Sequence, residues 1–172
     1  MSERGHITLV TGGARSGKSA LAERLAARHG GSRIYIATAE VGDDEMSHRI
    51  AEHQRRRGTG WITLEEPLDL TGALDRSDGQ GVRLVDCLTL WLANLIAAGR
   101  DVDAEGDALA ATLASLPGAA ILVSNEVGLG IVPDNRAARA FRDHAGRLNQ
   151  RIAAVAGCVL FMAAGLPLIL KG

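Results

Sequence analysis

The chain carries a glycine-rich segment, GGARSGKS at residues 12–19, between an apolar run and a helical pattern. This segment fits G-x-x-x-x-G-K-[ST], the P-loop motif whose backbone N–H groups enclose phosphate oxygens. Residues 6–11 predict a buried strand, and a helix is expected from Lys18 to about His29. Because the motif stands between a strand and a helix N-terminus, the sequence predicts a nucleotide site rather than a chance glycine-rich turn.

Three residues are expected to act on the phosphates or on a metal ion. Lys18 is placed to reach the β- and γ-phosphates, and the Ser19 hydroxyl to coordinate Mg²⁺. Asp86 ends the apolar run 82–86 and is the candidate acid for the metal, although capping of the next helix is an equally open interpretation. The predicted nucleotide-binding residues of the loop are Gly12, Gly13, Ala14, Arg15, Ser16, Gly17, Lys18 and Ser19.

Composition narrows the class of protein. The 172 residues favour one domain, and the formal net charge of -1 argues against a nucleic-acid or anionic-membrane binder. Cys87 and Cys158 both lie in apolar runs, so neither a disulfide framework nor a cysteine metal site is expected. No apolar stretch reaches the ~18 residues of a membrane span, and the N-terminus does not resemble a signal peptide. We therefore expect a cytoplasmic protein with a single domain over residues 1–172.

Apolar runs alternate with helical patterns along the rest of the chain. Further strands are expected at residues 33–38, 82–86, 119–124 and 158–162, with a short edge strand at 168–170. Helices are expected at residues 43–57, through Trp91 and Leu95, and at 134–156, and residues 75–81 form a turn cluster. This order predicts an α/β fold of three layers, a RecA-like P-loop NTPase with a mostly parallel sheet and helices on both faces.

The expected helix at residues 43–57 carries one basic face. Arg49, His53 and Arg56 are spaced at i, i+4 and i+7, which brings an imidazole between two guanidinium groups. On the residues alone a solvated basic face is the favoured interpretation. The functional alternative is a histidine beside phosphates, with arginines that stabilise charge during phosphoryl or nucleotidyl transfer.

Several segments together resemble one family. They are residues 11–19, 35–38, 43–46 with Arg49, Ile50 and His53, the segment SNEVGLGIVP at 124–133, and the helix that follows Asn135. The family is the bifunctional adenosylcobinamide kinase / adenosylcobinamide-phosphate guanylyltransferase of cobalamin biosynthesis. The similarity spans nearly the full length, and the segment at 124–133 is far more specific than the P-loop.

The resemblance implies two reactions and an assembly. A nucleoside triphosphate, ATP or GTP, phosphorylates the hydroxyl of adenosylcobinamide, and GTP then donates GMP to that phosphate. The second reaction passes through a GMP–histidine intermediate, for which His53 is the matching position. A neutral imidazole is a competent nucleophile at phosphorus. The resemblance also implies a homotrimer. The alternatives are a single-activity P-loop small-molecule kinase and a P-loop regulatory NTPase.

The same resemblance implies further nucleotide contacts. They are Ala37, Thr38, Ala39, Gln54, Arg55, Arg56, Arg57, Glu65 and Asp86. Asp86 stands where relatives contact metal or guanine, and Glu66 leaves the register at Glu65 open by one residue. Asn125 and Glu126 end a strand expected beside the P-loop strand, so they either face the site or only shape a loop.

Overall fold

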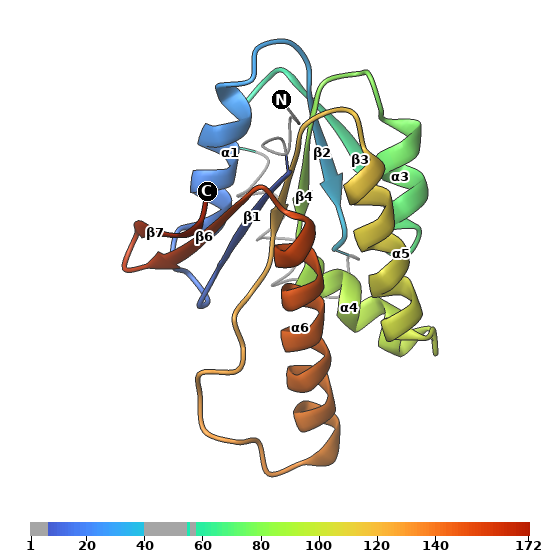
Figure 1. Ribbon diagram of the computed structural model, residues 1–172, viewed down its shortest axis with the longest axis vertical. Coiled ribbons are helices and arrows are strands. Elements are labelled where there is room, and N and C mark those ends of the chain that lie inside the picture. Colours follow the sequence, from blue (N-terminus) through green and yellow to red (C-terminus); the bar gives the residue numbers. More distant parts are fainter. Residues whose placement is uncertain (1–6, 40–54, 56–57) are drawn as a thin grey trace.

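The computed structural model describes residues 7–39, 55 and 58–172. Its described part is one seven-stranded sheet with helices packed on it (Figure 1). The strands are β1 (Ile7–Gly12), β2 (Arg33–Ala37), β3 (Trp61–Glu65), β4 (Val82–Asp86), β5 (Ala120–Val123), β6 (Cys158–Ala163) and β7 (Leu166–Lys171). The helices are α1 (Lys18–Ala27), α3 (Leu70–Arg76), α4 (Leu88–Ala97), α5 (Val102–Ser115) and α6 (Arg136–Val155).

The strand order places the P-loop strand near the middle of the sheet. The order is β3-β2-β4-β5-β1-β6-β7, and every neighbouring pair is parallel except β6 and β7. A two-residue turn joins that antiparallel pair, with Ala164 and Gly165 both at positive φ, as a tight hairpin requires. The predicted, mostly parallel α/β sheet is therefore confirmed, and the carboxyl ends of β1, β5 and β4 lie in a row.

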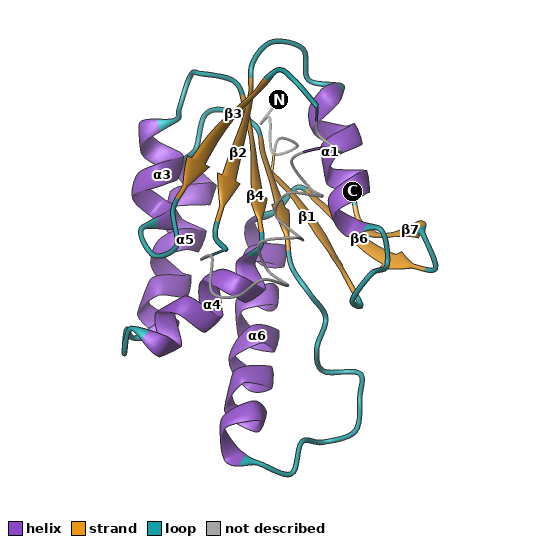
Figure 2. Cartoon of the chain, turned by 180° about the vertical axis from the view of Figure 1, so that it is seen from behind, coloured by secondary structure: helices purple, strands orange, loops and turns teal. Residues whose placement is uncertain are grey.

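The central strands β2, β4, β5 and β1 are buried on both faces, which is why they are mostly apolar rather than alternating. On β2, Ile34 and Ile36 join the core cluster under α3, α4, α5 and α6, whereas Tyr35 joins the cluster under α1. Figure 2 shows α1 on one side of the sheet and the other four described helices on the opposite side. The expected three layers are present.

Three elements lie where the apolar patterns predict none. These are β3, α3 and α5. The strand β3 is an edge strand with exposed residues, and its hydrogen bonds to β2 decide its conformation. The short helix α3 includes the first two residues of the expected turn cluster 75–81, which was wrong there, and it is capped by Asp69. The expected helix at 43–57 lies outside the described residues except for Arg55, which is helical and exposed.

A charged residue is buried near the amino end of β4. Arg83 has an exposed fraction of 0%, and its Nη1 donates to Asp78 Oδ1 at 2.9 Å and to the Leu74 carbonyl at 3.2 Å. Its Nε donates to the Ala119 carbonyl at 3.4 Å. A Cβ on Gly118 would lie 2.4 Å from Nη2, so the guanidinium needs a glycine there. Arg83 therefore joins β4, α3 and the start of β5 from inside the protein.

Candidate nucleotide and metal site

The P-loop leaves the end of β1 through a backbone that only glycine fits. Gly12 has φ +143°, and a Cβ there would lie 2.5 Å from the Met162 carbonyl oxygen of β6. Gly17 has φ +96° and is the N-cap of α1 without a side-chain cap, so the helix N-terminus keeps its N–H groups open. The loop also rests on the β6–β7 turn, where Gly165 N donates to Ser16 O at 3.2 Å.

Lys18 lies inside this loop and is only 7% exposed. Its Nζ donates to the Gly13 carbonyl at 2.6 Å. Among the residues that the structure describes, no carboxylate lies within 4 Å of this nitrogen. Burial lowers the pKa of Lys18, and the neighbouring Asp86 opposes that shift. In the described structure this buried ammonium donates only to a carbonyl, so a phosphate can form a charge-assisted hydrogen bond with it.

Two hydroxyls, one in the loop and one directly before it, support the fit of a ligand. Thr11 Oγ1 and Ser16 Oγ are buried and have no hydrogen-bond partner among the described residues. An unpaired buried hydroxyl carries a free-energy cost, so native structures rarely leave one without a partner or ligand. A bound nucleotide would bring oxygen atoms that can accept these two hydrogens.

Asp86 ends β4, and one strand, β5, separates β4 from β1. Asp86 Oδ2 accepts from Tyr35 Oη at 3.1 Å. The oxygens of Asp86 and of the half-buried Ser19 are ligands of the type that Mg²⁺ prefers. The described residues hold no group of three or more His, Cys, Asp or Glu that could bind a metal by themselves.

The neighbouring Cys87 adds no charge to the site. Its thiol is buried, and burial raises the pKa of Cys87 to about 11, so the group stays protonated at neutral pH. Asp86 is therefore the anionic neighbour that acts on Lys18. Both cysteines are free, as expected from the sequence.

The segment after β2 is fastened to the end of β4. Thr38 is fully buried, and its Oγ1 donates to the Cys87 carbonyl and accepts from Cys87 N, both at 2.8 Å. Asn94 Nδ2 of α4 donates to the Thr38 carbonyl at 2.8 Å. The Thr38 hydroxyl is thus hydrogen-bonded to the Cys87 backbone, and Ala37 and Ala39 are its neighbours in the chain. The predicted nucleotide contacts of Ala37, Thr38 and Ala39 stay predictions.

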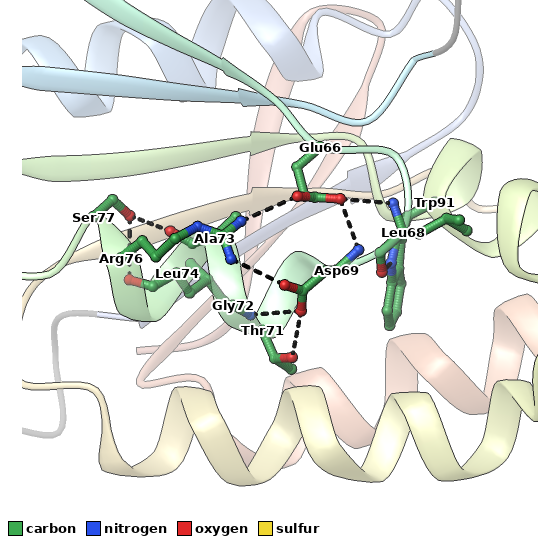
Figure 3. A network of polar contacts seen from close by, with 10 residues as sticks. All are labelled: Glu66, Leu68, Asp69, Thr71, Gly72, Ala73, Leu74, Arg76, Ser77 and Trp91. Carbon is green, nitrogen blue, oxygen red and sulfur yellow. Dashed lines mark hydrogen bonds and ion pairs between the residues drawn. The ribbon is translucent and has the colours of Figure 1, made fainter.

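The structure separates the two adjacent glutamates. Glu66 accepts from the backbone N–H groups of Leu68 and Asp69 and pairs with Arg76 at 3.1 Å, which ties it to the start of α3 (Figure 3). Glu65, at the exposed end of β3, makes no side-chain hydrogen bond to any residue in the described part of the chain. Glu65 is therefore the one of the two with a side chain available for a ligand.

The tip of β5 lies directly beside the P-loop. Glu126 N donates to the Gly12 carbonyl at 2.9 Å. Asn125 is held by α4 and α6, because its N–H donates to Thr89 Oγ1 at 2.8 Å and its carbonyl accepts from Asn149 Nδ2 at 3.2 Å. The strand β5 pairs with the P-loop strand β1, as expected, and the choice between facing the site and shaping a loop stays open for Asn125 and Glu126. The supporting Thr89 and Asn149 were not predicted, and their polar character on helices was the one signal available.

The predicted nucleophile is not among the described residues. His53, Gln54, Arg56 and Arg57 lie outside the described residues. The described part of the site is therefore the phosphate loop with Lys18 and Ser19, the acid Asp86, and the tip of β5.

A family described as cobinamide kinase / cobinamide phosphate guanyltransferase matches residues 8–170. The chain belongs to this family. It is 55% identical over 168 residues to the bifunctional adenosylcobalamin biosynthesis protein CobP of Pseudomonas aeruginosa, covering 95% of this chain and 96% of that one. It is also 41% identical over 182 residues to the protein CobU of Salmonella typhimurium, covering 96% and 99%.

Among solved structures, one described as an ATPase domain superposes with a TM-score of 0.51 at 13% identity. The match covers 93% of this chain and 70% of that one. At this identity the likeness bears on the fold alone, and it agrees with the expected P-loop NTPase fold. In the described residues, no helix is both long and apolar enough to cross a membrane.

Proposed function

We propose that this chain phosphorylates adenosylcobinamide and then transfers GMP from GTP to the product, adenosylcobinamide phosphate. The observation that carries the proposal is the buried Lys18, held among the described residues only by a loop carbonyl and lying near Asp86, in a chain of this family. No observation on the described residues favours the single-activity kinase or the regulatory NTPase.

In the first reaction, the substrate hydroxyl oxygen attacks the γ-phosphorus of ATP or GTP, and the bond from that phosphorus to the β-phosphate oxygen breaks. The hydroxyl proton leaves with solvent or a basic group. Lys18 and the N–H groups of residues 12–19 hold the charge that develops on the phosphate oxygens. Mg²⁺, when bound through Ser19 and Asp86, would neutralise charge on the β- and γ-oxygens. Burial of Lys18 strengthens its interaction with these oxygens.

In the second reaction, an imidazole nitrogen of His53 attacks the α-phosphorus of GTP, and pyrophosphate leaves. A phosphate oxygen of adenosylcobinamide phosphate then displaces the imidazole, which gives adenosyl-GDP-cobinamide. We assign nucleotide contacts to Ala37, Thr38, Ala39, Gln54, Arg55, Arg56, Arg57 and Glu65, as the family resemblance implies. The available side chain of Glu65 supports its place in that set.

We also propose that the enzyme is a cytoplasmic homotrimer. The edge strand β7 supports self-association, because it exposes large apolar side chains along an edge with no further strand among the described residues. These side chains are Leu166, Leu168, Ile169 and Leu170. A Leu168→Glu variant is expected to lower the molar mass measured by light scattering from that of a trimer to that of a monomer.

The decisive experiment for the two-step activity uses α-labelled GTP with Mg²⁺ and compares the wild type with His53→Ala. We expect the wild type to retain a protein-bound label that is labile in acid and stable in alkali, as a phosphoramidate is, and the variant to retain none. His144→Ala is the matched control, since this other histidine lies on α6 beside Arg147 and should not affect labelling.

Two outcomes would contradict the proposal in different ways. Transfer of γ-phosphate to cobinamide without any protein label indicates direct transfer or a kinase alone. A label that survives in His53→Ala shows that the nucleophile is another residue.

A further inference from the structure

Tyr35 and Asp86 are brought together by strand register rather than by sequence. The two residues are 51 positions apart, on the adjacent parallel strands β2 and β4. Ala37 lies opposite Asp86, and Tyr35 precedes Ala37 by two residues, so Tyr35 and Asp86 point to the same face of the sheet. A tyrosine side chain is long enough to reach a diagonal neighbour. Its hydroxyl donates to Asp86 Oδ2 at 3.1 Å.

The packing around Tyr35 fixes its ring independently of this hydrogen bond. It is 6% exposed and meets Trp61 of β3 edge to face, with the ring centroids 6.2 Å apart and the planes at 87°. Arg33 covers the Trp61 ring, with its guanidinium carbon 5.4 Å from the ring centroid. Because the ring has little freedom inside this packing, the phenol oxygen occupies a defined place beside the carboxylate.

The hydrogen bond from Tyr35 matters because Lys18 lies near the same carboxylate. Asp86 is near enough to Lys18 to influence its pKa. A carboxylate that could turn toward the ammonium would form an ion pair and occupy both groups. A hydrogen bond from a neutral phenol holds the carboxylate and leaves its negative charge in place.

We propose that Tyr35 is a positioning residue that orients the Asp86 carboxylate for the Mg²⁺ of a bound nucleotide. This inference rests on the proposed metal role of Asp86. Groups that hydrogen-bond to a metal-binding carboxylate fix its orientation, and their loss commonly weakens metal affinity 10–100-fold. Tyr35 acts through Asp86 and is not required to touch the nucleotide.

The test is the Mg²⁺ dependence of nucleotide binding, measured with a fluorescent GTP analogue and without any corrinoid. In Tyr35→Phe, the Mg²⁺ concentration that gives half of the metal-dependent increase in affinity should rise about 10-fold. Binding of the analogue in EDTA should stay unchanged. Phenylalanine keeps the ring against Trp61, so the variant should fold, and its thermal unfolding midpoint is measured alongside.

Two further variants separate the causes. Trp61→Phe keeps an aromatic ring against Tyr35 and keeps the Tyr35 hydroxyl, and it should leave the Mg²⁺ dependence as in the wild type. Asp86→Asn should raise the Mg²⁺ concentration that gives half of the metal-dependent increase in affinity at least as much as Tyr35→Phe does. These two results, together with the shift in Tyr35→Phe, support the proposal.

The opposite outcomes are also distinct. An unchanged Mg²⁺ dependence in Tyr35→Phe with a shift in Asp86→Asn overturns the role of Tyr35 alone. An unchanged dependence in Asp86→Asn overturns the metal role of Asp86 and the role of Tyr35 with it. Loss of affinity in EDTA by the same factor shows that the hydroxyl acts only on general packing.

Discussion

Lys18, at the start of α1, and Arg83, on β4, are two buried cations, and their surroundings differ. Arg83 donates to a carboxylate and to two backbone carbonyls, and of its nitrogens only Nη2 has no partner among the described residues. Lys18 donates to a single carbonyl of its own loop. A cation that stabilises the fold is neutralised by the fold, because an uncompensated buried charge is costly. A cation that serves a substrate keeps its charge available, and burial lowers its pKa as a consequence.

The largest expected effect comes from removing the Lys18 charge. Lys18→Met should lower the rate of both phosphoryl and guanylyl transfer about 10²–10³-fold, because it removes a cation that stabilises developing phosphate charge. The thermal unfolding midpoint should stay the same or rise, since a buried ammonium without an ion pair opposes folding. Steady-state kinetics and calorimetry measure the two effects. A drop in stability equal to that of a broken ion pair would remove the contrast with Arg83.

Breaking the ion pair between Arg83 and Asp78 should lower stability and leave activity unchanged, which is the reverse of the effect expected for Lys18→Met. Asp78→Asn leaves the guanidinium buried without its carboxylate, and we expect the free energy of unfolding to fall by about 3 kcal/mol, at the low end for buried pairs because Asp78 is 34% exposed. Catalytic constants of the folded variant should change little, because Arg83 lies near the amino end of β4. Urea unfolding and kinetics at low temperature test this. A selective loss of activity would show that the two ends of β4 are coupled.

The second lysine of the chain provides a smaller structural comparison. Lys171 Nζ donates to the Ala153 and Ala154 carbonyls at 3.0 Å each, near the carboxyl end of α6. Lys171→Ala should lower the free energy of unfolding by about 0.3–1 kcal/mol, as expected for a cation at a helix C-terminus. Activity should not change. An effect of several kcal/mol, measured by urea unfolding, would mean that the exposed lysine does more than cap this helix.

The smallest effect is expected at an exposed acid between two helices. Hydrogen bonds from Arg151, aided by Arg147, lower the pKa of Asp103 below its ordinary value of 3.8. A carboxylate with a lowered pKa in the folded state adds stability that is present above the ordinary pKa and is lost as the pH falls through the folded-state pKa. The difference in unfolding midpoint between wild type and Asp103→Asn should therefore be present at neutral pH and shrink below about pH 4. A difference that persists in acid would point to packing instead.

The sequence predicted most of the sheet, because buried parallel strands leave continuous apolar runs and P-loops leave a local motif. It missed β3, where an edge strand shows no such run, and α5, which has no clear apolar stripe. At the site, the loop with Lys18 and Ser19 was predicted directly. The choice between Glu65 and Glu66 was not, because only the contacts of Glu66 with the start of α3 show that it is already engaged.

Residues 12–19 specify a phosphate loop on their own, since its backbone geometry and its charge both come from adjacent residues. The same holds for the alternation of strands and helices and for the family to which the chain belongs. The strand order decided the rest. It brought Tyr35 to Asp86 across two strands, left Lys18 buried without an ion pair to any described residue, and placed the tip of β5 against the loop. Packing between distant segments determines these contacts, so they cannot be predicted from the local sequence around each residue.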